Sequence, residues 1–80
     1  MNKTEIIEKI NAMLTEELEI DADLLRPEAS LKNDLEIDSL DFVDVVVLIN
    51  DEFGFRPTTE EMKKLKTLND LYEFIASHEA

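Results

Sequence analysis

The sequence predicts an all-α domain, a small four-helix bundle with three main helices, one short helix and a long first loop. Apolar residues recur at helical spacing in three separate segments. The one segment rich in β-branched residues has no second strand to pair with, which argues against a sheet. Because 80 residues are enough for one small core and no repeat or linker is visible, residues 1–80 are expected to form a single domain.

The first helix is predicted from Thr4 to Leu18, with Thr4 as its N-cap. Its apolar residues follow a helical period: Ile6, Ile7, Ile10, Met13 or Leu14, and Leu18. The connection from Ile20 to Asp38 follows and contains Pro27. A loop of this length is unusual in a compact domain unless it packs or has a function. Its leucines and Ile37 are expected to anchor it: Leu24, Leu25, Leu31 and Leu35.

Residues Ser39 to Phe53 could be a strand by propensity, because the segment contains four valines. The segment is longer than most strands and has no internal turn signal, so a helix is the better prediction. Gly54, the only glycine, is expected to end this helix in the left-handed conformation.

The C-terminal part is predicted to hold a short helix and a last long helix. Thr58 and Glu61 fit a capping box for a helix from Thr59 to Leu65. Thr67 with Asp70 then opens the last helix. The inward stripe of this helix is expected to be Leu68, Leu71, Tyr72 and Ile75.

The predicted helix over residues 39–53 is apolar on two sides. One side forms an ordinary core face: Phe42, Val45, Val46, Ile49 and Phe53. The opposite side carries Leu40, Val43 and Val47, with acids beside them: Asp41, Asp44 and Asp51. Since a domain this small cannot easily cover both sides, the second side is predicted to be an exposed docking strip. The alternative is that loop leucines such as Leu31 or Leu35 cover it.

The charge is strongly negative and unevenly distributed. Acids outnumber bases 20 to 8, for a net charge of −12. From Glu16 to Glu52 there are 13 acids against Arg26 and Lys32, which is a net of −11, so the field is concentrated there. Such a surface repels nucleic acid and anionic membranes and attracts basic protein patches, although net charge also serves simple solubility. The chain has no cysteine, so disulfides and thiolate sites are excluded, and a cytoplasmic location is expected.

Ser39 lies at the predicted start of the two-sided helix. Helix starts expose backbone N–H groups and a partial positive charge, which favour an attached phosphate. A serine at this position is also a common N-cap with no further role.

Residues Asp34–Leu40 read Asp-Leu-Glu-Ile-Asp-Ser-Leu, which resembles the phosphopantetheine attachment motif of acyl carrier proteins. The likeness extends along the chain, through the loop pattern (Ile20, Pro27-Glu28, Leu31, Leu35), Asp51-Glu52-Phe53 and Thr67-Leu68 to Ile75. The resemblance implies a four-helix bundle that carries acyl groups and is not an enzyme.

The resemblance also implies a modification and a set of partners. Ser39, beside Asp38, would take 4′-phosphopantetheine from coenzyme A through a phosphopantetheinyl transferase. The arm would carry acyl groups as thioesters between enzymes of fatty-acid or polyketide-type biosynthesis. These partners would be acyl synthetase, ketosynthase and acyltransferase-type enzymes with basic patches. The residues expected to meet them are Leu40, Asp41, Val43, Asp44, Val47, Asp51 and Arg56. No metal, nucleic acid or membrane is implied, and the carrier would be a monomer.

Two departures from the family pattern stand out. Glu36 replaces the usual glycine, so it would be strained if its φ is positive. The stretch Gly54–Pro57 is less acidic than is usual, with Arg56 adding a positive charge and Phe55 a candidate for the missing aliphatic residue. Both changes point to a specialised carrier.

Other readings are weaker. His78 is the only histidine, and no catalytic triad can be assembled around it, so a solvated surface residue is expected. Calcium loops at Asp21 or Asp34 fail, because Arg26 and Ser39 stand where glycine is required. An unmodified acidic interaction module stays open, as does a peptidyl or aminoacyl carrier, although the motif of peptidyl carriers usually has glycines before the serine.

Overall fold

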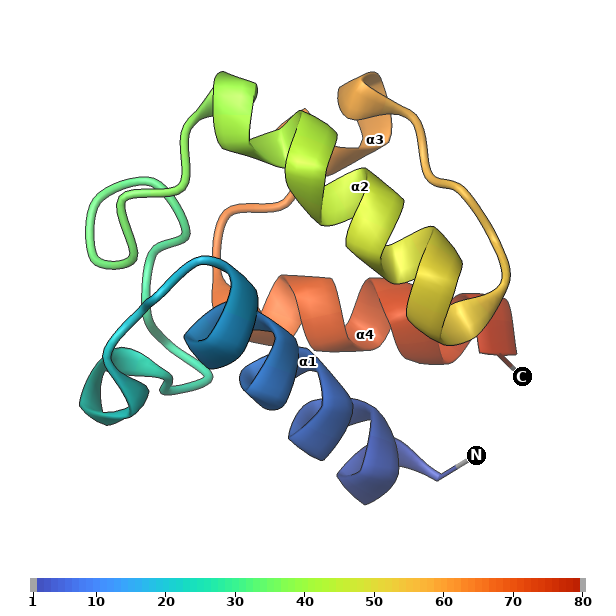
Figure 1. The fold of residues 1–80 in the computed structure, drawn as a ribbon, viewed down its shortest axis with the longest axis horizontal. Helices are drawn as coiled ribbons and strands as arrows, with labels where there is room; N and C mark the ends of the chain where they lie inside the picture. The colour runs from blue at the N-terminus through green and yellow to red at the C-terminus, as the bar shows by residue number, and fades with distance from the viewer. Residues whose placement is uncertain (1, 80) are drawn as a thin grey trace.

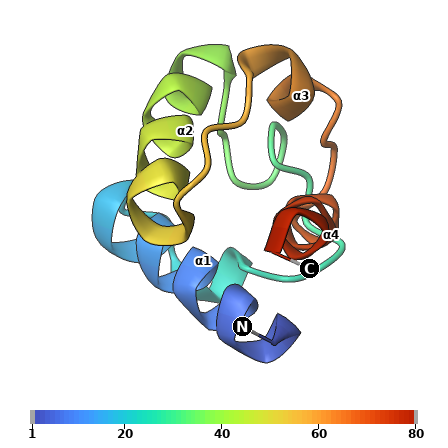
Figure 2. The same cartoon turned by 90° about the vertical axis from the view of Figure 1, so that its right-hand side faces the viewer.

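The computed structural model describes residues 2–79 and confirms the all-α prediction. Its elements are the helices α1 (Lys3–Glu17), α2 (Ser39–Phe53), α3 (Thr59–Lys63) and α4 (Leu68–Glu79), and the 3-10 turn η1 (Ala22–Leu24). The part described contains no strand, only an isolated antiparallel bridge between Ser30 and Thr67. Helix α1 packs against α4 and α2 against α3, with α2 lying across the α1–α4 pair (Figure 1). Figure 2, turned by 90°, shows α2 and α3 flanking one end of the molecule.

The N-cap of helix α1 lies two residues before the one that the sequence suggested. Its N-cap is Asn2, whose side-chain oxygen accepts a hydrogen bond from the Glu5 amide at 2.9 Å, so the prediction of Thr4 as the cap is wrong. The apolar stripe is as expected, because Ile6, Ile10, Met13 and Leu14 are buried. Ile7 and Leu18 are half-buried at the edge of the core.

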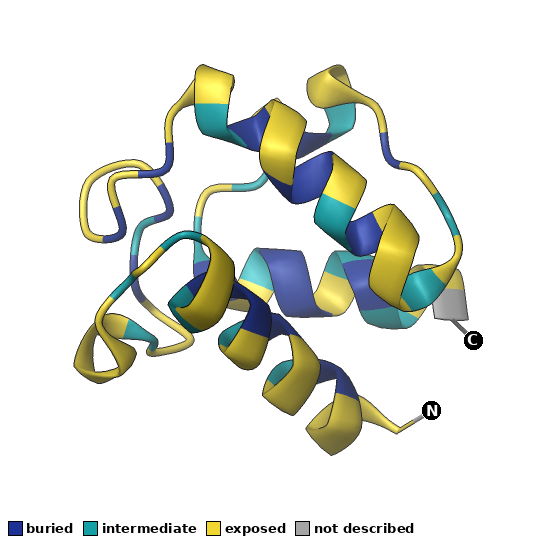
Figure 3. Cartoon of the chain, viewed as in Figure 1, coloured by how far each residue is buried: buried dark blue, intermediate teal, exposed yellow. Residues whose placement is uncertain are grey.

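The long connection between α1 and α2 packs onto the core, as its leucines predict. Leu31, Leu35 and Ile37 are buried, and Leu25 is half-buried. Leu24 is exposed, so its predicted role as an anchor is wrong, because it ends the short turn η1 and faces solvent. Figure 3 shows buried positions interspersed with exposed ones along this loop.

Backbone hydrogen bonds tie this loop to the junction between α3 and α4. The Leu31 amide donates to the Lys66 carbonyl oxygen at 2.9 Å, and the Leu68 amide donates to that of Ala29 at 2.9 Å. Since backbone polar groups must be paired when they leave water, these bonds let an irregular segment lie against the core. The loop is therefore part of the wall around the site described below.

Helix α2 has the bounds that the sequence predicts, despite its valines. Packing overrides the low helix propensity, because the inner face is buried: Phe42, Val45, Val46 and Ile49. Phe53 completes this face but is only half-buried. Gly54 ends the helix with φ +79°, and its amide donates to the Asn50 carbonyl oxygen at 3.0 Å, which is the predicted left-handed cap.

The last two helices begin as predicted. Thr58 and Glu61 form a reciprocal capping box at α3, which ends at Lys63, two residues before the predicted end. The inward stripe of α4 is fully buried, as expected: Leu68, Leu71, Tyr72 and Ile75.

His78 has a packing role that the sequence did not suggest. Its ring stacks on Phe55 with the centroids 4.4 Å apart, and it contacts Phe74 at 4.5 Å. His78 is exposed, as expected for a surface residue, but its ring also packs on two aromatic side chains. The contact joins the stretch after α2 to α4.

The two faces of α2 should respond differently to truncation. Ile49→Ala removes a fully buried side chain, and we expect the free energy of unfolding to fall by about 2–5 kcal/mol. Val47→Ala, on the outer face of the same helix, should change it by less than about 1 kcal/mol. Urea denaturation followed by circular dichroism measures both. Equal losses would mean that the outer face is covered.

Acid should weaken the start of α4. The amides of Thr67 and Lys66 donate to Asp70, each at 3.1 Å, and hold the pKa of that carboxyl below its ordinary value of 3.8. The ionised group therefore stabilises the fold above its unfolded pKa, and this contribution is lost as pH falls through the lower folded pKa.

The stability difference between the wild type and Asp70→Asn should consequently be constant above about pH 5 and shrink as the pH falls below 3.8 in urea titrations. Glu8→Gln, on the exposed side of α1, is the control and should run parallel to the wild type. A stability difference that does not change with pH would show that the ionised Asp70 carboxylate does not stabilise the fold.

Candidate functional site

Ser39 is the first residue of α2 and is exposed. Asp38 before it is the N-cap, and its carboxylate accepts hydrogen bonds from the amides of Leu40 at 2.9 Å and Asp41 at 3.1 Å. The Asp41 carboxylate in turn accepts from the Asp38 amide at 3.2 Å, which closes a capping box. The box therefore fixes the turn that carries the Ser39 hydroxyl.

The residues just before the helix set its position. Ile37 is buried, and its amide donates to the Leu31 carbonyl oxygen at 2.8 Å. Glu36 has φ +56°, in the left-handed region that favours glycine, so the predicted strain at this position is present. This conformation lets the chain turn so that Ile37 faces inward while Ser39, two residues later, faces solvent.

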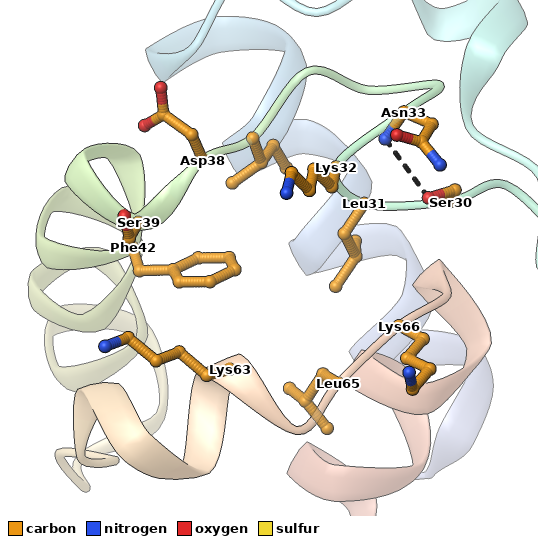
Figure 4. A pocket seen from close by; sticks show the side chains of 11 residues that line it. Ser30, Leu31, Lys32, Asn33, Asp38, Ser39, Phe42, Lys63, Leu65 and Lys66 are labelled. Carbon is orange, nitrogen blue, oxygen red and sulfur yellow. Dashed lines mark hydrogen bonds between the residues drawn. The ribbon is translucent and has the colours of Figure 1, made fainter.

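A pocket of about 630 Å³ opens beside Ser39 (Figure 4). It lies between the long loop, the start of α2 and the end of α3. Its apolar lining is Leu31, Ile37, Phe42 and Leu65. Its polar lining is Ser30, Lys32, Asn33, Asp38, Ser39, Lys63 and Lys66.

The site fits a phosphopantetheine group attached at the serine. The Ser39 hydroxyl is open to an enzyme that would modify it, and the adjacent pocket can accommodate part of a flexible arm. The amides at the start of α2 were expected to favour an attached phosphate. Two of them, those of Leu40 and Asp41, already donate hydrogen bonds to the Asp38 carboxylate.

The outer side of α2 is an exposed apolar strip, as its pattern predicts. Leu40 is 80% exposed, Val43 51% and Val47 41%. Leu31 and Leu35 are buried in the core, which excludes the alternative that they cover this side. Figure 3 shows the exposed positions on the outer turns of α2.

The charged residues predicted for this surface lie around the strip. Asp44 and Asp51 are exposed on α2, and Asp41 is half-buried in its first turn. Arg56 is exposed and lines a groove of about 230 Å³ together with Val43 and other residues: Val46, Pro57, Thr58 and Thr59. Pro57 is buried and Phe55 is half-buried, so both contribute the apolar packing expected of this stretch.

The lysines at the pocket are functional candidates that the sequence reasoning missed. Lys32 comes from the long loop, whereas Lys63 and Lys66 come from the end of α3 and the segment after it. The available signal was the concentration of three of the eight bases within residues 63–66. Only the fold brings them to Lys32 and Ser39.

Two other kinds of site are absent from the residues described. No group of three or more histidine, aspartate or glutamate side chains among residues 2–79 is arranged to hold a metal ion. None of the helices there combines the length and apolar character needed to cross a membrane.

Comparisons with known proteins agree with this geometry. Residues 8–75 match the family model described as a phosphopantetheine attachment site. The chain is 43% identical over 75 residues to an acyl carrier protein of Thermosynechococcus vestitus, covering 94% of this chain and 93% of the relative. It is 37% identical over 79 residues to that of Lactobacillus johnsonii, covering 99% of both. It is also 33% identical to the mitochondrial acyl carrier protein 2 of Arabidopsis thaliana, covering 98% of this chain and 62% of the relative. The chain therefore belongs to the acyl carrier protein family, whose members are non-catalytic carriers with a phosphopantetheine prosthetic group.

Proposed function

We propose that Ser39 is the residue that carries the phosphopantetheine group, and that residues 1–80 act as a single carrier domain. The observation that supports this most directly is the exposed hydroxyl at the first turn of α2, beside a pocket and next to the apolar strip. Ser30 also lines the pocket, but it is half-buried in a loop turn, where its hydroxyl accepts a hydrogen bond from the Asn33 amide. Ser77 lies near the end of α4 and does not line this pocket.

When bound, the group supplies a terminal thiol that holds an acyl group as a thioester. The part played by this chain is to anchor and present that arm. The capping box between Asp38 and Asp41 holds the anchor point rigid. A tether of this kind raises the effective concentration of cargo at a docked enzyme, so the protein contacts themselves can be weak.

The partners are proposed to dock on the outer face of α2. Leu40, Val43 and Val47 offer the apolar contact, and Asp41, Asp44 and Asp51 surround it with negative charge. Exposed charges at the rim of a contact steer encounter with oppositely charged partners. The surface therefore suits enzymes with basic patches, namely a phosphopantetheinyl transferase and acyl synthetase, ketosynthase or acyltransferase-type enzymes. Arg56 adds one positive charge beside Val43 and selects partners that have an acid there.

The pathway is proposed to be acyl-chain biosynthesis of the fatty-acid or polyketide type. The fatty-acid pathway is the simpler assignment, and Arg56 and Glu36 are the features that would mark a specialised carrier. We further propose a cytoplasmic monomer, which fits a chain without cysteine that carries a net charge of −12.

Intact mass identifies the modified residue. Incubation with coenzyme A, magnesium and a broad-specificity phosphopantetheinyl transferase should raise the intact mass by one phosphopantetheinyl group. Ser39→Ala should abolish this change, whereas the control Ser77→Ala should be modified like the wild type. Modification of Ser39→Ala would place the attachment elsewhere. An unmodified wild type, with a control carrier converted, would favour the acidic interaction module, and selective loading by an aminoacyl-activating enzyme would favour a peptidyl carrier.

Charge reversal on α2 tests the docking surface. Asp44→Lys and Asp51→Lys should lower kcat/KM for the transferase by roughly fivefold or more at low salt, because they reverse charges that steer the encounter. Asp23→Lys makes the same charge change away from the strip, in η1, and should have a much smaller effect. The difference should diminish as ionic strength rises. If all three variants behave alike, the strip is not the docking surface.

A further inference from the structure

We infer that Lys63 and Lys32 form an anion-binding site that receives the phosphodiester of the arm carried on Ser39. The inference rests on the proposed function, since it takes Ser39 as the attachment residue. It adds two residues that hold the arm, outside the attachment motif and outside the docking strip.

The fold brings these lysines to the serine from separate segments. Lys32 lies in the long loop and Lys63 ends α3, yet both line the pocket that Ser39 borders. In Figure 4 the Lys63 side chain extends beneath Phe42 with its amine toward the side of the pocket formed by α2. The Lys32 side chain lies between Asp38 and Leu31 in the same view.

Both amines are available for an anionic ligand. The ion pairs among residues 2–79 are those of Lys3 with Glu73 and of Lys9 with Glu52, so neither pocket lysine is engaged in one. Lys66 differs from these two lysines. It lies close enough to Asp70 for the Lys66 charge to lower the pKa of the Asp70 carboxyl, and in Figure 4 the Lys66 amine points away from Ser39. Lys63 and Lys32 are therefore the lysines left to face a group on Ser39.

A phosphodiester on Ser39 needs this positive charge. Asp38 is adjacent, and the surrounding segment from Glu16 to Glu52 has a net charge of −11. The backbone amides at the start of α2 can stabilise the phosphodiester only in part, because those of Leu40 and Asp41 already donate hydrogen bonds to the Asp38 carboxylate. Two ammonium groups at the pocket rim would offset the repulsion between the phosphodiester and these carboxylates.

The geometry favours the phosphodiester over a charged group on the cargo. The phosphate is joined directly to the serine oxygen, and the pocket lies beside that oxygen, whereas the thiol is at the far end of the arm. The apolar lining from Leu31, Ile37, Phe42 and Leu65 would contact the uncharged part of the arm nearest the phosphate.

The test compares the apo protein with the holo protein, in which the arm carries no cargo and the phosphodiester is the only added anion. Conversion is first verified by intact mass. The side-chain NMR signals of each lysine are then compared in both forms. For Lys63 and Lys32 we expect a clear chemical-shift change in the holo form, because the added anion lies close to their amines. Lys64, the C-cap of α3, lies outside the pocket lining and should shift less.

A second measurement uses variants. The holo form should be more resistant to thermal unfolding than the apo form, and Lys32→Gln with Lys63→Gln should reduce this gap, whereas Lys64→Gln should leave it intact. Verified modification of Ser39 with equal shifts for Lys63, Lys32 and Lys64 would overturn the lysine site while leaving the proposed function in place. A protein whose Ser39 is not modified would overturn both.

Discussion

The burial of Ile37 directly before the N-cap of α2 is the constraint on which the site depends. Since the Ile37 side chain must reach the core and the Asp38 carboxylate must reach the amides of the first turn, only one start is open to α2. That start leaves Ser39 outside the core, at the rim of the pocket. The left-handed conformation of Glu36 permits the turn, so a local strain accompanies the placement of the serine.

Helix α2 connects this anchor to the surface on which partners are proposed to dock. Its inner residues, such as Val45 and Ile49, are buried against the other helices, while Leu40 and Val43 remain exposed because a chain of 80 residues has no further element to cover them. The same helix thus holds the bundle together and offers an apolar contact. The orientation of the strip relative to Ser39 is fixed, because both belong to one rigid helix.

Charge is divided between two surfaces with different roles. The exposed acids around α2 create a negative field that acts at a distance on approaching proteins. The lysines at the pocket oppose that field locally, where a phosphodiester would otherwise stand next to Asp38. A net charge summed over the chain hides this arrangement, because three of the eight bases line one pocket.

The sequence by itself determined the helix order, the bounds of α2, the left-handed cap at Gly54 and the exposure of Leu40, since these follow from local period, capping chemistry and the small size of the core. Tertiary structure alone decided that Leu24 faces solvent, that His78 stacks on Phe55, and that Lys32 and Lys63 line the same pocket as Ser39. These contacts join residues far apart in the chain. No local pattern encodes them, because they depend on how the long loop and the α3 segment fold back over the helices.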